Sequence, residues 1–392
     1  MSLVADPFVG TTTAAGRKTA TQPDVAEVAI EFIPGTEWDS AISGFDEVCQ
    51  EQLHVFAANR WPSVRQEPVL FRLNGEIVGG SLMMIQRLPL GVGSISIAKW
   101  APMLARIDRP DARAIYRGMI EALIAEYAVK RRMMISVLPQ APLGALNHEY
   151  EHMIERGFRP GAKMLFPSRY IVKLRLSDAE QRKSLHQKWR YHLNKADKAG
   201  LTFEHAAPER FSEFDALYHV MTDRKRFSDH SAYEDTAKAL MALDVPAARP
   251  ELFFVRHEGD VVAGAIIFKS GDRAVYLYGA TNEKALPLRA GYFIHWHIIR
   301  WLRENTRAAW YDLGGTDGFH GLHQFKKGMV GDAGVITPVP PVANFAAYQV
   351  PYLMGAGAFA ARDLVHQVRR AIDTWRTDRA KPDQTKQPGE EG

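Results

Sequence analysis

The chain is poor in cysteine and in long apolar runs. Cys49 is its single cysteine in 392 residues, so no internal disulfide can form. No Cys/His cluster has zinc-ligand spacing, and the longest apolar runs fall well short of the roughly 18 residues of a membrane span. The sequence also lacks a Walker loop, a Gly-x-Ser-x-Gly elbow and a His-Glu-x-x-His motif. These absences exclude disulfide-stapled and zinc-dependent scaffolds, and we expect no bound metal and a cytoplasmic location.

The composition is otherwise that of a globular protein. Hydrophobic residues make up 46% of the chain and aromatic residues 10%, which excludes wholesale disorder, collagen and coiled coil. The net charge of +4 is too small to argue for a nucleic-acid binder by itself. The length leaves room for two domains. Residues 1–25 predict a disordered leader and residues 377–392 a disordered tail.

An internal repeat predicts how the chain is organised. Residues 70–84 and 254–268 both read as two apolar strands around a tight turn, with Gly75 and Gly259 at the turns, 184 residues apart. At the same offset Gly80 matches Gly264. In both halves a further strand, a long helical segment and another strand follow in the same order. We therefore expect a duplicated α/β (α+β) unit with central mixed sheets, as domains at 26–180 and 181–342.

Two further segments are predicted to be helical. One joins the two halves, and the other follows the second half. Residues 181–199 hold six basic side chains against the single acid Asp197, and their apolar positions predict one amphipathic joining helix that stops at Gly200. Its basic face is either a solvated surface or a site for an anionic substrate. Residues 343–376 predict a C-terminal helix that packs on the body, with contact to a membrane surface as the alternative.

A glycine-rich loop is the densest set of unusual residues. Residues 310–318, Trp-Tyr-Asp-Leu-Gly-Gly-Thr-Asp-Gly, read as a strand that runs into a loop with exposed N–H groups. Residues 325–328, Phe-Lys-Lys-Gly, come soon after. A lysine there can stabilise an oxyanion or a phosphate, while the alternative is an ordinary connection with surface charge. We assign Cys49 to packing within a helix, not to nucleophilic catalysis.

Four stretches in order resemble the Fem family, the non-ribosomal aminoacyl transferases that build peptidoglycan bridges. They are Lys99-Trp100-Ala101-Pro102, the basic helix at 189–200, Arg224-Lys225-Arg226-Phe227, and Tyr311-Asp312-Leu313-Gly314-Gly315 followed by Phe325-Lys326-Lys327-Gly328. Members consist of two tandem acetyltransferase-like (GNAT) domains. The resemblance covers about residues 30–340 and implies amide formation on an amine of a cell-envelope precursor.

The resemblance also implies roles for individual residues. Lys326 would steady the carbonyl oxygen as it gains charge, and Asp312 would orient the amine or shape the loop as a turn-capping carboxylate. Arg224 would hold a phosphate of the acceptor. The remaining substrate-binding candidates are Trp189, Arg190, Tyr278, Gly315 and Phe325. No dedicated base stands out among Asp312, Asp317 and His320.

The donor and partners stay open at this point. We expect no bound cofactor but an activated acyl donor as co-substrate, either aminoacyl-tRNA or acyl-CoA, and a nucleotide- or lipid-linked muropeptide-like acceptor. tRNA and the inner face of the cytoplasmic membrane are further partners. The stretch between Arg224 and Glu251 is too short for the tRNA-binding coiled-coil arm of larger members, and Leu288-Arg289-Ala290-Gly291-Tyr292 departs from an acetyl-CoA loop. The alternatives are a CoA-dependent N-acyltransferase acting on polysaccharide or lipid precursors and a non-catalytic GNAT-fold binding protein.

Overall fold

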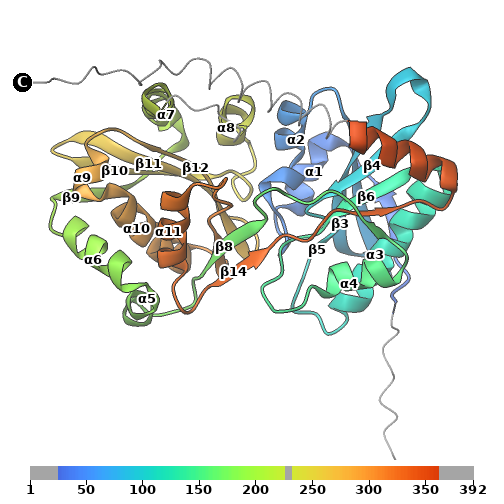
Figure 1. The fold of residues 1–392 in the computed structure, drawn as a ribbon, viewed down its shortest axis with the longest axis horizontal. Coiled ribbons are helices and arrows are strands. Elements are labelled where there is room, and N and C mark those ends of the chain that lie inside the picture. Colours follow the sequence, from blue (N-terminus) through green and yellow to red (C-terminus); the bar gives the residue numbers. More distant parts are fainter. Residues whose placement is uncertain (1–24, 226–231, 362–392) are drawn as a thin grey trace, which may run out of the picture.

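Two α/β units lie side by side in the computed structural model of the chain (Figure 1). The structure describes residues 25–225 and 232–361. The expected leader, apart from residue 25, and the expected tail lie outside these residues. So do Phe227 and the segment 362–376 of the expected C-terminal helix.

The first sheet is mixed, and helices pack on both of its faces. Its strands lie in the order β1 (Ala29–Phe32), β2 (Arg65–Leu73), β3 (Glu76–Arg87), β4 (Ser94–Lys99), β6 (Met134–Leu138), β15 (Ala343–Phe345) and β7 (Arg159–Pro160), with β5 (Met103–Leu104) on β3. Only β4 and β6 pair in parallel along this path. Alternate β2 residues face opposite cores, because side chains alternate along a strand. Leu70 packs with α1 (Gly35–Ile42) and α2 (His54–Arg60), whereas Phe71 packs with α3 (Ala112–Leu123).

The second sheet repeats this arrangement. Its order is β9 (Leu201–Ala206), β10 (Glu251–His257), β11 (Asp260–Phe268), β12 (Arg273–Thr281), β13 (Trp310–Asp312), β8 (Ser168–Lys173) and β14 (Val335–Pro338), with β12 and β13 parallel. One face packs on α7 (Phe211–Lys225) and α8 (Tyr233–Met241). The other face packs on α6 (Gln187–Ala196), α9 (Ala285–Leu288), α10 (Ala290–Asn305) and α11 (His320–Val330). The expected α/β fold with two mixed sheets is confirmed.

The duplication extends to single residues of the two hairpins. Asn74 and Gly75 have positive φ at the first turn, and Glu258 and Gly259 have positive φ at the second. Each hairpin has an irregularity in its pairing at the same place, between residues 71 and 72 and between residues 255 and 256. These pairs are also 184 residues apart. The shared strand order, turns and irregularities support the repeat that the sequence indicates.

One strand in each sheet lies outside the expected limits of its unit. Strand β8 precedes the second unit in the chain but pairs with β13 and β14. Strand β15 follows the second unit but pairs with β6 and β7. Sheet membership therefore does not follow the expected boundary at residue 180 or the expected helical segment that starts at 343. The described helical residues of that segment, 349–361, pack on the first unit beside Ile95 and Met134.

The two units share a core and polar contacts. Trp38 and Phe56 of the first unit belong to the same apolar cluster as Phe214 and Leu240 of the second. The Arg307 guanidinium donates to the Phe45 carbonyl oxygen at 2.6 Å and pairs with a carboxylate of the first unit, Asp46. No described helix is long and apolar enough to cross a membrane.

The joining segment forms two helices where the sequence predicts one. Helix α5 (Asp178–Ser184) ends before α6 begins, with extended backbone at Leu185 and His186. The break is stabilised by tertiary hydrogen bonds, because the His186 N–H donates to Gly328 and the Asp332 N–H donates to Ser184. Periodicity alone does not detect such a break.

Candidate functional site

The glycine-rich loop leaves the sheet at the end of β13, where Asp312 is buried. One carboxylate oxygen accepts from the Gly314 N–H at 2.8 Å, and the other pairs with the Arg169 guanidinium at 3.0 Å. Gly314 has φ +75°, a conformation that favours glycine. Asp312 therefore shapes the loop and holds an arginine from β8, which fits the loop-shaping role expected for it.

Lys326 of α11 is buried, and its ammonium group binds backbone carbonyls of the same loop. Its Nζ donates to the carbonyl oxygens of Leu313 and Gly315, both at 2.5 Å. Burial, together with the nearby charge of Arg169, lowers the pKa of Lys326 to about 8. Two of the three N–H groups of the ammonium are thus accounted for by loop carbonyls. Lys326 itself is not among the residues that line the cavity beside this loop.

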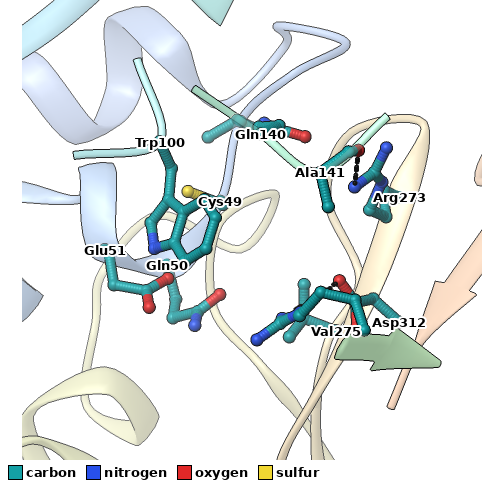
Figure 2. Close-up of a pocket in the computed structure, with 11 residues that line it drawn as sticks. Cys49, Gln50, Glu51, Trp100, Gln140, Ala141, Arg273, Val275 and Asp312 are labelled. Atoms are coloured by element: carbon teal, nitrogen blue, oxygen red, sulfur yellow. Dashed lines mark hydrogen bonds and ion pairs between the residues drawn. The ribbon is translucent and has the colours of Figure 1, made fainter. Parts of the chain in front are cut away.

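The loop borders a small cavity between the two units, which we call the interface pocket. Figure 2 shows Cys49, Glu51 and Trp100 on one side and Arg273 and Asp312 on the other. The cavity holds about 30 Å³. Its full lining is Val48, Cys49, Gln50, Glu51, Trp100, Gln140, Ala141, Arg169, Arg273, Val275 and Asp312. Both units therefore contribute to its walls.

Two arginines face this pocket. Arg169 pairs with Asp312, and its guanidinium lies 5.6 Å from the Trp100 ring centre. Arg273, at the start of β12, donates from Nη1 to the Ala141 carbonyl oxygen at 3.0 Å, and its Nε has no hydrogen-bond partner in the described chain. Burial lowers the pKa of Arg273. Guanidinium groups that line a cavity favour an anionic ligand, since they match carboxylate and phosphate geometry.

Further polar atoms at the interface pocket are buried without partners among the described residues. These are Oε1 of Gln50 and Nε1 of Trp100. Buried polar groups normally find a hydrogen-bond partner, so unpaired ones beside a cavity are sites where a ligand or water can bind. Together with the Arg273 Nε they give the cavity two unpaired donors and one unpaired acceptor.

Cys49 lies in this wall but is not suited to nucleophilic attack. Burial strongly raises the pKa of its thiol, so the thiolate is scarce at neutral pH. The expected packing role agrees with its place in a small apolar cluster with Trp100, Ala141 and Val339. The helical placement is wrong, because Cys49 has extended backbone and precedes a short 3-10 turn, Gln50–Gln52.

The aromatic binding candidates lie in the core and away from the interface pocket. The Trp189 ring packs against Tyr292 and Phe325 at centroid distances of 5.0 and 6.1 Å. Tyr278 is buried on the other face of the second sheet, and its hydroxyl lies 2.6 Å from Thr236 Oγ1. Trp189 and Phe325 therefore pack between helices, and Tyr278 packs against the sheet. The contacts of these rings are packing contacts within the core.

The other candidates occupy three separate places. Arg190 donates to the carbonyls of Lys183 and Leu185 and so stabilises the break before α6. Arg224 is exposed at the end of α7 and donates to the Thr281 carbonyl oxygen at 3.1 Å. Gly315 lies in the loop bound by Lys326. The structure thus brings together Asp312, Lys326 and Gly315 but not the remaining candidates.

Sequence reasoning missed the two arginines of the interface pocket. Arg273 is the one charged residue of β12 and starts it, and Arg169 lies near the start of β8, which ends with a second basic residue, Lys173. That pattern is a usable but weak signal, because strand ends often carry charge. It also missed Glu47, whose carboxyl group lines a neighbouring cavity and whose pKa is raised by burial to about 7.

Comparisons with known proteins agree with this architecture. Residues 181–327 match the family model described as an acetyltransferase (GNAT) domain. A crystal structure of FemX superposes with a TM-score of 0.67 at 16% identity, covering 84% of this chain and 100% of that chain. The C-terminal domain of a putative lysylphosphatidylglycerol synthetase from Agrobacterium fabrum gives a TM-score of 0.51 at 14% identity, covering 83% of this chain and 96% of that chain.

A second structure of the same kind, L-PGS from Bacillus licheniformis, also gives a TM-score of 0.51 at 14% identity, covering 83% of this chain and 96% of that chain. No curated protein matches the chain by sequence. The chain therefore has the Fem-like fold with GNAT-like units, and the expected resemblance is confirmed at the level of the fold.

Proposed function

We propose that the chain is an acyltransferase that joins an activated amino acid or other acyl group to an amine of an anionic envelope precursor. The interface pocket is the observation that carries this proposal. There Arg169 and Arg273 line a cavity beside the glycine-rich loop, where Asp312 pairs with Arg169 and the second carboxylate, Glu51, lies 3.8 Å from Lys99 Nζ. The buried Arg273 guanidinium, whose Nε has no hydrogen-bond partner in the described chain, suits a phosphate or carboxylate of the acceptor.

The loop and Lys326 assist the reaction by stabilising the negative charge that develops on the ester carbonyl oxygen. The acceptor amine attacks the carbonyl carbon of the activated ester, a C–N bond forms, the C–O bond to the donor breaks, and the departing oxygen takes a proton. The third N–H of the Lys326 ammonium stabilises the oxyanion that forms on the way. The two loop carbonyls hold that ammonium in place, which reduces the reorganisation needed during reaction.

The names of proteins with similar structures support the proposed class of acceptor. FemX and a putative lysylphosphatidylglycerol synthetase are among the proteins whose structures superpose on this chain. We therefore place the acceptor among lipid- or nucleotide-linked envelope precursors, with aminoacyl-tRNA as the donor of the leading proposal.

The experiment that tests the function compares envelope amides in a deletion strain and its parent. Mass spectrometry of muropeptides and lipids is expected to show an amide substituent that disappears on deletion and returns with the wild-type gene. Complementation with Arg273→Met should fail, while Arg87→Met, an exposed arginine far along β3, should restore it. Identical amide profiles in parent and deletion strains contradict the proposal.

A CoA-dependent N-acyltransferase is the second candidate, and the GNAT match over residues 181–327 favours it. The start of α10 leaves room near its backbone, since a Cβ at Gly291 would lie 4.0 Å from Phe325 Cζ. Isothermal titration with acetyl-CoA separates the candidates. Micromolar binding supports the CoA enzyme, and absence of binding supports the aminoacyl-tRNA donor.

We also propose contact of the C-terminal helical segment with the membrane surface. Val350 and Leu353 are 65% and 67% exposed there. Co-sedimentation with anionic liposomes should fall when both become serine. Equal recovery of the variant and the wild type contradicts this contact.

A further inference from the structure

A larger cavity adjoins the interface pocket, and we call it the side pocket. It holds about 290 Å³ and shares Gln140, Ala141 and Arg273 with the interface pocket. Its lining carries charged groups of both signs, with Glu47 and Glu149 as acids and Arg113 and Arg273 as bases. None of these four side chains has an ion-pair partner within 4 Å in the part of the chain that the structure describes.

The acidic side of this pocket is suited to an ammonium group. Glu47 follows α1 and Glu149 lies in α4 (His148–Glu155), and the charge of Glu149 contributes to the raised pKa of Glu47. One Glu47 oxygen accepts from the Leu104 N–H at 2.6 Å. Two carboxylates that share a cavity repel each other, and a cation between them removes the repulsion.

Tyr116 of α3 provides an independent sign of a ligand at the same place. Its side chain is 4% exposed and lines the side pocket, and its hydroxyl has no hydrogen-bond partner among the described residues. Burial raises the pKa of Tyr116, and the charges of Glu149 and Glu47 raise it further, so the three groups lie near one another. Two carboxylates and a phenol oxygen match the three N–H donors of an ammonium.

The opposite charge comes from Arg273. Its buried Nε has no hydrogen-bond partner in the described chain, and its guanidinium lines both cavities. A ligand with an anionic group beside its ammonium would satisfy both sides of the side pocket. A simple amine would leave the Arg273 Nε without a hydrogen-bond partner.

We propose that the side pocket binds the acceptor as an α-amino acid group, with its ammonium on Glu47, Glu149 and Tyr116 and its carboxylate on Arg273. A free amino acid and an amino acid end of a larger precursor share this chemistry. The assignment rests on the proposed function for its place in the reaction, but the binding itself does not require a donor.

Glu47 then acts as the base. The bound ammonium gives one proton to the Glu47 carboxylate, and the resulting amine attacks the donor ester carbonyl. The new amide keeps one of the two remaining N–H protons, and the departing oxygen takes the other. A carboxyl group with a pKa of about 7 is suited to accept a proton at neutral pH.

Ligand-observed NMR titrations with L-alanine and L-alaninamide test the pocket directly. L-Alanine should bind at least 10-fold more tightly than the amide, which lacks the carboxylate. Glu47→Gln and Tyr116→Phe should each weaken alanine binding about 10-fold, and Arg273→Met should erase the preference for alanine over alaninamide. Glu155→Gln, an exposed acid on α4, is the matched control and should bind like the wild type.

The pH dependence adds a readout that general misfolding does not produce. Alanine affinity in the wild type should rise with pH through about 7 as Glu47 loses its proton, and Glu47→Gln should lose that rise. Glu149, Tyr116, Arg113, Arg273 and Asp46 are the other charged or titratable groups around Glu47. Circular dichroism of each variant checks that it is folded.

The outcomes separate this inference from the proposed function. Absence of alanine binding, or equal affinity for alanine in the wild type and Glu47→Gln, overturns the side-pocket assignment. If alanine binding depends on Glu47 while the deletion strain keeps every envelope amide, the assignment stands and the proposed function fails.

Discussion

The two units have one scaffold but different loops at the interface. Both have the same strand order and the same irregular hairpin. In each hairpin an arginine, Arg72 or Arg256, bridges from the strand to the turn glycine carbonyl, at 2.7 and 3.0 Å. The parallel pair β4–β6 extends over five residue pairs, whereas β12–β13 ends after three, at Asp312.

The shorter pairing explains why chemistry is expected in the second unit. After Asp312 the chain leaves the sheet as a glycine-rich loop, and Lys326 binds the exposed carbonyls. After β6 the first unit continues as Pro139-Gln140-Ala141-Pro142, which forms a wall of both cavities. In the proposed reaction, one copy therefore supplies the glycine-rich loop and the other supplies cavity walls and acidic groups.

The largest expected effect comes from removing the Lys326 ammonium, which binds the glycine-rich loop of the second unit. Lys326→Met should lower the transfer rate by about 10²-fold, because loss of an oxyanion donor costs on the order of 3 kcal/mol. Lys327→Met is the matched control at the exposed neighbouring position. Single-turnover transfer measures both, and an unchanged rate for Lys326→Met would remove this residue from the mechanism.

The next effect tests the contribution of the first unit. Burial raises the pKa of Glu47 to about 7 from 4.5, so the folded state binds a proton more tightly than the unfolded state. The wild type should lose stability as the pH rises from about 4.5 through 7, a change on the order of 3 kcal/mol. Glu47→Gln should be more stable than the wild type at pH 8 by urea unfolding. Parallel pH profiles for the two proteins would contradict the burial of this charge.

Equivalent glycines test whether the two copies pack equally well. A Cβ would lie 2.8 Å from the Trp38 ring at Gly80 and 2.8 Å from the Phe214 ring at Gly264. Each change to alanine should destabilise by about 1–3 kcal/mol through overpacking. Gly144→Ala, with no atom within 4 Å, should have little effect on the urea midpoint. A large difference between Gly80→Ala and Gly264→Ala would show that one copy has more room to adjust.

The smallest effect comes from the paired arginines of the hairpins. Arg256 contacts both Glu204 and Glu213, whereas Arg72 contacts Glu31 alone among described acids. Partly exposed ion pairs contribute below about 1 kcal/mol, so each arginine-to-methionine change should shift stability only slightly. Arg256→Met should cost more than Arg72→Met, and the difference should shrink in 1 M salt. The reverse order would contradict an additive effect of the second carboxylate.

Local patterns in the sequence predict the duplicated hairpins and the loop at Asp312. Turn chemistry and alternating apolar residues act over a few positions, so Gly75 and Gly259 identify the same element twice. The pairing of β8 with β13 could not be predicted this way, because it joins residues far apart in the chain and depends on the sheet as a whole.

The same reason explains the missed side pocket. Glu47, Tyr116 and Arg273 lie on separate elements, and none belongs to a short motif. Periodicity places Trp189 correctly on an apolar helix face, but only the tertiary structure shows that this face is filled by Tyr292 and Phe325. Residue type indicates what a side chain can do, and the fold decides whether it meets a cavity.

The placement of β15 has a consequence for synthesis on the ribosome. The first sheet lacks the strand between β6 and β7 until residue 345 has emerged, by which time the whole second unit has been made. Nascent chains of intermediate length therefore expose open strand edges, which are prone to pairing with other chains. The first unit therefore cannot be produced whole from one uninterrupted stretch of the gene, whereas the strands of the second sheet all lie within residues 168–338.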